Sequence, residues 1–437
     1  MTRTRILILG GGYVGLYAAL TLRKKARDLV DITVLDRRAY MTYQPFLPEA
    51  AAGSIEPRHA VVPLRRELSG VKVLQGKVTG IRHADKTVDV TTDFGDALHV
   101  EYDEIVVALG SVARTLPIPG LKDFAIGFKH VEEAINLRNR VLGRIARAAT
   151  ATDPRLRARL LTFVFVGGGF AGVEAFAETE DMAKAALRYY PELDPGELRF
   201  LMVEAADRIL PELGQDMGEY AAAQMRGRGM RVLLGTRLES CVEGYVELSN
   251  GESFEADTVV WTAGVKPAPV LTLSDLPLGP KGHIITSPTL QVTTADGQVV
   301  PGAWAAGDCA QVPDLTKEQP AYCAPSAQHA VRQARRLGSN LAAHLRGHDV
   351  VEYKHKHLGL VASLGLNKGV ANVMGVKLKG WPAWFMHRTY HLMQIPTFNR
   401  KARIALDWSA AVFFRRDLVS LGRLHEPRRA FEEAASS

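Results

Sequence analysis

The chain has 437 residues, which at about 150 residues per domain predicts two to three domains and a large apolar core. Its residues are 47% apolar and 23% charged with a net charge of +7, a composition that excludes disordered, collagenous and simple coiled-coil proteins. With 3 cysteines, no signal-peptide pattern and no apolar run of about 18 residues, we expect a reducing compartment and no membrane span.

The N-terminus carries a glycine-rich turn between a predicted strand and a predicted helix. Residues 5–25 read as a buried strand (RILIL), the pattern G-x-G-x-x-G and a helix from Leu16 to Lys25. In such a turn Gly10 allows the sharp bend, Gly12 lets the backbone approach a pyrophosphate, and Gly15 lets the helix pack closely on the strand. The helix N-terminus then faces the phosphates.

The same strand, glycine turn and helix return 157 residues later. Residues 162–166 predict a second buried strand, followed by another G-x-G-x-x-G pattern and a helix that begins near Val173. Gly167, Gly169 and Gly172 take the same three roles as in the first copy. Two copies in register predict two dinucleotide sites, and FAD with a nicotinamide nucleotide is the most economical pair.

A carboxylate ends the strand that follows each glycine turn. Asp36 closes the predicted strand 31–35, and Glu204 closes the predicted strand 199–203. A carboxylate at this place can accept hydrogen bonds from both ribose hydroxyls of an adenosine. It would repel a 2′-phosphate, so Glu204 predicts a preference for NADH over NADPH. Glycines that served only as tight turns would leave these acids unexplained.

Three further segments, each a predicted buried strand with a small-residue turn, end at Gly110, Gly264 and Asp308. All three resemble segments of the flavoprotein disulfide reductase superfamily, whose members have two dinucleotide-binding domains. The resemblance implies that the first two segments cross between domains and that Asp308 binds the ribityl and phosphate region of FAD. It implies an α/β fold with two Rossmann-like domains. The implied boundaries are 1–120 (FAD domain, first part), 121–265 (NADH domain), 266–345 (FAD domain, second part) and 346–437 (a helical, basic and aromatic C-terminal region).

The cysteines exclude dithiol chemistry. A disulfide reductase of this superfamily needs a C-x-x-x-x-C pair near residues 41–55, and that loop contains no cysteine. Sulfide:quinone reductases resemble the same architecture but carry sulfur on cysteines beside the flavin. We expect Cys309 and Cys323 to be buried structural thiols. The sequence shows no metal-ligand spacing, so no metal site is predicted.

Further motifs along the chain are Gln44–Leu47, Ala51–Ser54, Val62–Arg65, Gly169–Glu174, Val203–Pro211, Ala327–Gln333, Phe398–Arg400 and Asp407–Trp408. Through these motifs the chain resembles, from residue 4 to about 420, the type II NADH dehydrogenases, single-chain NADH:quinone oxidoreductases of respiratory chains that do not pump protons. The resemblance implies a bound FAD that receives hydride from NADH and then passes two electrons to a quinone.

The resemblance also assigns two catalytic residues. Glu174 would lie near the flavin and quinone and organise a charge-transfer state or proton delivery, and Gln328 would bond a quinone carbonyl, with Ala327 and Arg332 as further quinone-site candidates. From position alone, both have simpler interpretations. Glu174 falls in the first turn of a predicted helix, where the helix dipole favours any carboxylate. Gln328 would be a helix-surface amide.

Arg332 departs from the family pattern, which has a second glutamine four positions after Gln328. Gln333 is one position further along and is rotated by about 100° on a helix, so it cannot simply replace the missing amide. Arg332 would bind a quinone carbonyl or a more anionic acceptor, or would turn away toward an acidic side chain.

The C-terminal region is basic and aromatic. Lys377 to Ser437 contains eleven Lys or Arg and five Asp or Glu, so 11 − 5 = +6 of the net charge lies there. The predicted amphipathic stripes are Trp381, Trp384, Phe385, Leu392 and Met393, and Ile404, Trp408, Ala411, Val412 and Arg415. This composition favours peripheral contact with the cytoplasmic face of the cell membrane over nucleic-acid binding. The alternative is that both stripes pack on the globule or on a second copy in a homodimer.

Two other functions fit parts of the sequence. A soluble NADH-dependent flavin reductase would donate electrons to a small redox protein or a quinone-like metabolite, and its basic tail would dock an acidic partner. A redox sensor would use FAD and NADH to switch an interaction surface without catalysis. Glu174 argues against the sensor, because a sensor needs no acid near an acceptor.

Overall fold

The computed structural model describes residues 3–355, 359–414, 416–420 and 432. With those gaps, the chain forms two compact units. Unit 1 comprises Met1–Thr42, Val61–Arg114 and Gly264–Leu358, and unit 2 comprises Tyr43–Ala60, Thr115–Ala263 and Gly359–Ser437.

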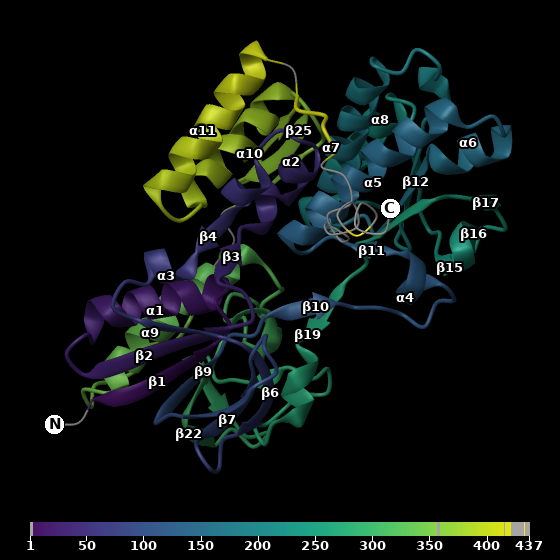
Figure 1. The fold of residues 1–437 in the computed structure, drawn as a ribbon. Helices are drawn as coiled ribbons and strands as arrows, with labels where there is room; N and C mark the ends of the chain where they lie inside the picture. Colours follow the sequence, from purple (N-terminus) through teal and green to yellow (C-terminus); the bar gives the residue numbers. More distant parts are fainter. Residues whose placement is uncertain (1–2, 356–358, 415, 421–431, 433–437) are drawn as a thin grey trace. The chain divides into compact units, whose positions relative to one another are not determined.

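A six-stranded sheet with the order β21-β22-β9-β1-β2-β5 forms the centre of unit 1 (Figure 1). Its strands are β1 (Thr4–Leu9), β2 (Val30–Asp36), β5 (Lys72–Gln75), β9 (Glu104–Val107), β21 (Gln291–Thr293) and β22 (Val299–Ala305). All neighbours are parallel except β21 and β22. The side chains of Ile6 to Leu9 are at most 1% exposed, which explains why this strand reads as an unbroken apolar run.

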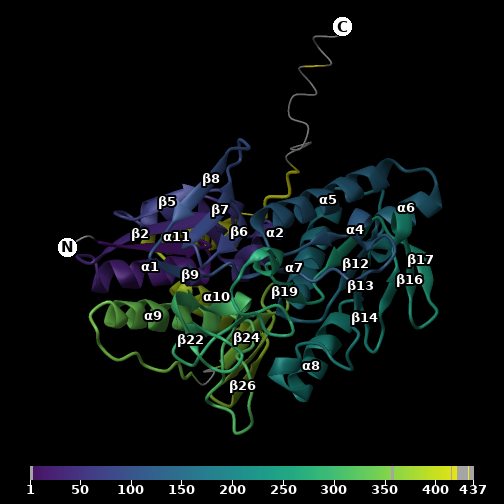
Figure 2. The same ribbon diagram turned by 90° about the horizontal axis from the view of Figure 1, so that it is seen from below.

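Two helices of unit 1, α1 (Tyr13–Lys25) and α9 (Ala327–His344), lie side by side although they are 300 residues apart in the chain (Figures 1 and 2). α1 also contacts β1 and β2. The smaller elements of unit 1 are β3 (Tyr40–Thr42), β4 (Val61–Pro63), α3 (Leu64–Glu67), β6 (Lys77–Arg82), β7 (Thr87–Thr91), β8 (Ala97–Glu101), β10 (Ser111–Ala113), β19 (Val265–Pro267), β20 (Ile284–Ile285) and β23 (Ala310–Gln311).

Unit 2 repeats this design with a parallel five-stranded sheet in the order β11-β18-β12-β13-β14. Its strands are β11 (Ile126–Gly127), β12 (Thr162–Val166), β13 (Arg199–Val203), β14 (Arg231–Leu233) and β18 (Thr258–Trp261). In unit 1, β1 precedes the glycine turn and lies between β2, which ends at Asp36, and β9, which leads to Gly110. In unit 2, β12 lies in the same way between β13, which leads to Glu204, and β18, which leads to Gly264. The predicted α/β class with two Rossmann-like sheets is therefore confirmed.

The helices of unit 2 include α7 (Phe170–Leu187), which contacts β12 and β13, and near the C-terminus α10 (Trp381–Gln394) and α11 (Phe398–Phe413) (Figures 1 and 2). The other elements of unit 2 are α2 (Leu47–Ala51), α4 (Leu121–Phe124), α5 (Val131–Thr150), α6 (Pro154–Leu160), α8 (Gln215–Arg226), β15 (Leu238–Ser240), β16 (Tyr245–Leu248), β17 (Ser253–Glu255), β24 (Gly359–Ser363), β25 (Gly369–Val373) and β26 (Val376–Lys379).

The C-terminal helices turn part of their predicted apolar stripes inward. On α11, Ile404 is fully buried, and Trp408 donates a 2.7 Å hydrogen bond from Nε1 to Glu49. For these two residues the alternative of packing on the globule is correct, because Ile404 is buried and Trp408 contacts the buried carboxylate of Glu49 and the ring of Phe46. The predicted stripe member Arg415 lies outside the described residues. No helix in the described part of the chain is long and apolar enough to cross a membrane.

Candidate functional site: two glycine turns and a buried carboxylate

The first glycine turn follows β1 in unit 1. Gly10 has φ +101°, and a Cβ there would lie 2.3 Å from the carbonyl oxygen of Ala108. A Cβ at Gly15 would lie 1.8 Å from the carbonyl oxygen of Gly10. Gly12 is different, because its φ of −72° suits any residue and a Cβ there would meet no atom of the described chain within 4 Å. The protein's own packing thus requires the outer glycines, whereas the middle one keeps open the space that a pyrophosphate would fill.

The second glycine turn, after β12 in unit 2, has the same construction. Gly167 has φ +112°, and a Cβ at Gly172 would lie 2.0 Å from the carbonyl oxygen of Gly167. Gly169 has φ −73° and faces space that is free of the described residues to 4 Å. The residues of both turns therefore fit a dinucleotide whose phosphates approach the middle glycine at a helix N-terminus.

Each turn is held by the acid that ends the next strand. The Asp36 carboxylate accepts hydrogen bonds from the backbone N–H of Gly11 at 2.6 Å and of Arg38 at 2.6 Å. Burial raises the pKa of Asp36, although these two amides act in the opposite direction. In unit 2, Glu204 accepts from the N–H of Gly168 and, at 2.7 Å, from that of Ala206. The structure thus brings each acid directly against its glycine turn.

The predicted residues Gly110, Gly264 and Asp308 all belong to unit 1. Gly110 (φ +64°) precedes β10, Gly264 (φ +88°) precedes β19, and the two strands pair antiparallel. Asp308 follows β22 and accepts a 2.7 Å hydrogen bond from the hydroxyl of Ser111. The chain therefore gathers Asp308 and the turn after Gly110, the placement expected of residues that hold one cofactor.

Gln333 has a function that sequence reasoning missed. Its side chain is 2% exposed, and its Oε1 accepts a 2.8 Å hydrogen bond from the N–H of Gly307, next to Asp308. The side chain therefore points into unit 1 and fixes the turn that carries Asp308. This orientation agrees with the helical argument that Gln333 cannot take the place of the family's second glutamine.

The quinone-site candidates occupy the first turns of α9. Ser326 caps this helix by accepting a 3.1 Å hydrogen bond from the N–H of His329, so Ala327 and Gln328 are its first two residues. Arg332 donates a 3.2 Å hydrogen bond to the carbonyl oxygen of Gln328, one turn earlier. Its guanidinium consequently stays close to Gln328, and this region remains cationic.

Glu174 lies in the second turn of α7 and not in the first turn, because the helix already begins at Phe170. The helix dipole therefore explains this carboxylate less well than its sequence position suggested. Glu174 is 6% exposed, and its Oε1 accepts a 2.9 Å hydrogen bond from the N–H of Ser363. The same oxygen lies 2.9 Å from Nε2 of His387. The histidine, 213 positions later in the chain, gave no signal in the sequence.

The cysteines are not arranged for redox chemistry. Cys309 is fully buried, as predicted, and its thiol donates to the carbonyl oxygens of Val107 and Ala306. Burial raises the pKa of Cys309 to about 11. Cys323 is only half-buried, and burial likewise raises its pKa to about 11. Both thiols therefore stay protonated and poorly nucleophilic at neutral pH.

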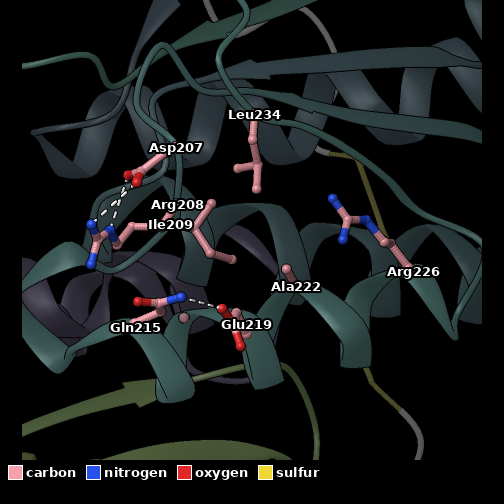
Figure 3. Close-up of a pocket in the computed structure, with 9 residues that line it drawn as sticks. Asp207, Arg208, Ile209, Gln215, Glu219, Ala222, Arg226 and Leu234 are labelled. Carbon is pink, nitrogen blue, oxygen red and sulfur yellow. Dashed lines mark hydrogen bonds and ion pairs between the residues drawn. The ribbon is translucent and has the colours of Figure 1, made fainter.

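A cavity of about 120 Å³ lies between α8 and the loop after Glu204 (Figure 3). Its lining residues are Asp207, Arg208, Ile209, Gln215, Gly218, Glu219, Ala222, Arg226 and Leu234. Figure 3 shows that Asp207 pairs with Arg208 and Gln215 with Glu219, whereas Arg226 donates its hydrogen bond to the carbonyl oxygen of Val232 outside the lining. The cavity is smaller than the roughly 300 Å³ at which ligand pockets begin, and it contains none of the predicted site residues.

Comparisons with known proteins identify the family of this chain. The family described as pyridine nucleotide-disulphide oxidoreductase matches residues 4–334. The type II NADH:quinone oxidoreductase Ndh of Mycobacterium tuberculosis is 28% identical over 422 residues, covering 93% of this chain and 88% of that protein. A type II NADH:quinone oxidoreductase of Staphylococcus epidermidis is 30% identical over 392 residues, covering 88% and 94%.

Among solved structures, NDH2 from Plasmodium falciparum in complex with NADH has a TM-score of 0.88 at 17% identity, covering 96% of this chain and 100% of that one. This likeness shows that the fold is shared. The family model and the sequence relatives confirm the family that the motifs predicted. The chain belongs to the pyridine nucleotide-disulphide oxidoreductase family and, within it, to the type II NADH:quinone oxidoreductases.

Proposed function

We propose that this protein oxidises NADH and reduces a quinone, without proton pumping, as a respiratory enzyme with FAD as its resident cofactor. The proposal depends on the pair of glycine turns. In each turn, free space faces the middle glycine, and a carboxylate accepts a hydrogen bond from the backbone of the turn. When bound, FAD would supply the redox centre that takes hydride from NADH and gives two electrons to the acceptor. The names of the sequence relatives support quinone as that acceptor.

In this proposal, unit 1 binds FAD and unit 2 binds NADH. Gly10, Gly12 and Gly15 hold the FAD pyrophosphate, Asp36 binds its adenosine ribose, and Gly110, Gly264 and Asp308 line the rest of the cofactor. Gly167, Gly169 and Gly172 hold the NADH pyrophosphate, and Glu204 binds its adenosine ribose. The glycine turns mainly orient the two nucleotides, because the backbone N–H groups of a helix N-terminus attract phosphate.

The acceptor side uses Ala327, Gln328 and Arg332 of α9, with Glu174 as the group that handles a proton. Gln328 would donate from its amide to a quinone carbonyl, and the nearby guanidinium would stabilise negative charge that develops on the quinone oxygen. Glu174 suits proton handling because it is buried and held by an amide and an imidazole.

Rapid mixing of the purified protein tests this function. The flavin absorbance should bleach on mixing with NADH and return on mixing with menadione or with a long-tail menaquinone in detergent. Ferredoxin serves as the third acceptor, because a flavin reductase for small redox proteins would be reoxidised by it. Fast reoxidation by the protein carrier alone would refute the quinone assignment.

Replacement of Glu204 by glutamine should narrow the preference for NADH over NADPH. The negative charge beside the adenosine ribose repels a 2′-phosphate, and its removal should change the ratio of the two kcat/KM values by about tenfold, or ~1.4 kcal/mol. Glu212, an exposed carboxylate on the following turn, provides the control substitution to glutamine. If E204Q keeps the wild-type ratio of kcat/KM for NADH and NADPH, Glu204 does not bind the adenosine ribose.

We further propose that α10 and α11 rest on the cytoplasmic face of the cell membrane. On α10, Trp381 is 55% exposed and Met393 68%, and on α11, Phe398, Leu406 and Phe413 are 67–84% exposed. An exposed apolar surface of this kind marks a lipid or protein contact. Arg403 is exposed beside it and Lys401 lies half-buried nearby, which favours anionic lipid headgroups.

The double substitution of Leu406 and Phe413 by glutamate should lower binding to anionic vesicles at least about tenfold, since each side chain contributes on the order of 1–2 kcal/mol when buried. Flotation with phosphatidylglycerol vesicles measures this binding. Activity with menadione, a quinone without an isoprenoid tail, should be preserved, because this acceptor does not have to be drawn from the bilayer. If the double variant instead changes the protein from dimer to monomer and leaves flotation unaltered, the surface joins two copies of the chain.

A further inference from the structure

A buried ionic cluster in unit 2 contains a histidine to which the proposed function assigns no role. His387, on α10, is 1% exposed, and its Nε2 lies 2.9 Å from Oε1 of Glu174 on α7. The other ring nitrogen, Nδ1, is also buried and has no hydrogen-bond partner among the described residues. Burying an imidazole nitrogen without a hydrogen-bond partner costs free energy of folding, so a functional reason for a histidine at this position is worth testing.

Two of the three glutamates in the cluster pair with arginines, and Glu174 pairs with His387. Arg388 pairs with Glu49 at 3.0 Å, and Arg416 pairs with Glu178 at 3.5 Å. Glu49 and Glu178 are 2% and 1% exposed, so each of these two ion pairs has a carboxylate that is shielded from water. Asp181 pairs with Arg228 at 2.8 Å, so among the described residues three carboxylates, Glu49, Glu174 and Glu178, remain against two arginines. The cluster is electrically neutral only when it carries one additional proton, and the imidazole beside Glu174 is a base that can hold it.

The surroundings of His387 favour its protonated form. Burial alone would lower the pKa of His387, but the carboxylates of Glu174, Glu49 and Glu178 outweigh burial and raise it above the ordinary 6.5. The other charged or polar groups that face the cluster are Asp181 of α7, Ser363 of β24, Trp408 of α11, and Arg388 and His391 of α10. His387 thus keeps its proton to a higher pH than a free histidine.

A second histidine continues the series toward the surface of unit 2. His391 lies one helical turn after His387, with ring centroids 4.6 Å apart, and is half-buried. Its Nδ1 lies 3.2 Å from the hydroxyl of Tyr43. Burial and the adjacent His387 hold the pKa of His391 well below its usual range, so its imidazole is neutral. Tyr43, His391, His387 and Glu174 therefore follow one another in space, and the two imidazoles are joined by an edge-to-face ring contact without a hydrogen bond.

We propose that His387 is a positioning residue that gives Glu174 the proton taken up from solvent during quinone reduction, an inference that rests on the proposed function. The balance is NADH + H⁺ + quinone → NAD⁺ + quinol. Both electrons and one proton leave NADH as hydride, so one proton must come from water. His387 gives its Nε2 proton to the Glu174 carboxylate, becomes neutral, and regains a proton through His391.

The test separates the two half-reactions of the FAD-loaded enzyme by rapid mixing. In His387→Gln, bleaching by NADH should keep its wild-type rate, whereas reoxidation by menadione should slow about a hundredfold, the size of a lost proton-transfer group. In the wild type, the reoxidation rate should fall as pH rises through the raised pKa of His387, because its protonated form disappears. That fall should be absent from the variant.

The matched control is His83→Gln, which removes another buried histidine. His83 is 9% exposed and bonds Tyr102 and the carbonyl oxygen of Pro301 in unit 1. Its variant should keep both half-reactions and the pH dependence.

The outcomes distinguish the two proposals. A wild type that NADH does not bleach, or that a quinone does not reoxidise, refutes the proposed function itself. A wild type that does both, with H387Q showing the same reoxidation rate and the same fall with pH, overturns the role of His387. If H387Q does not fold, His391→Gln at the half-buried end of the series takes its place, and an unchanged reoxidation rate in that variant overturns the proposal.

Discussion

Replacement of Gly12 by valine is expected to give a folded protein that contains no flavin and has no activity. The backbone at Gly12 suits any residue, and its Cβ would meet no described atom within 4 Å, so the free energy of unfolding of the apoprotein should change by no more than about 1–2 kcal/mol. A valine side chain would occupy the space proposed for the FAD pyrophosphate. The flavin content, measured by absorbance after acid release, checks the result.

Gly143 provides the control for this substitution. It lies within α5, and a Cβ there would likewise meet no described atom within 4 Å. Gly143→Val should keep its flavin and its activity. If Gly12→Val retains stoichiometric flavin, the first glycine turn is not the FAD site.

Replacement of Gly169 by valine should give the complementary defect. The protein should remain yellow, because the FAD turn in unit 1 is unchanged. The KM for NADH should rise about a hundredfold or more, which corresponds to ~2.7 kcal/mol of lost binding, because the side chain fills the space for the NADH pyrophosphate. Steady-state kinetics with NADH measure this, and dithionite, which needs no nucleotide site, should still bleach the flavin. Loss of flavin from this variant with normal NADH affinity would reverse the assignment of the two turns.

The central strands and turns could be predicted from the sequence because their signal is local. Strands β12 and β13 have the bounds that their apolar runs predicted, Thr162–Val166 and Arg199–Val203, since parallel strands that are buried on both faces read as unbroken apolar segments. The helices after the glycine turns begin three residues earlier than expected, at Tyr13 and Phe170. Glycine is a poor helix former, so Gly15 and Gly172 in the first turns made the predicted helices start too late.

The buried ionic cluster could not be predicted, because its partners are distant in the chain. Glu49, Glu174 and His387 come from three helices and carry no shared spacing. An isolated glutamate in a sequence reads as a surface residue, and only the fold shows that its charge is enclosed and paired. The inward orientation of two residues of the α11 stripe could not be predicted for a related reason. A helical pattern shows that one face is apolar, but tertiary contacts decide whether Ile404 and Trp408 cover the protein or face outward.

The most direct measurement is an anaerobic titration of the purified, FAD-reconstituted protein with NADH, followed by absorbance. We expect one flavin per chain and complete bleaching at one equivalent of NADH, because one glycine turn holds the flavin nucleotide and the other holds the nucleotide that reduces it. A protein that stays colourless after reconstitution with FAD, or that stays yellow in excess NADH, would contradict it.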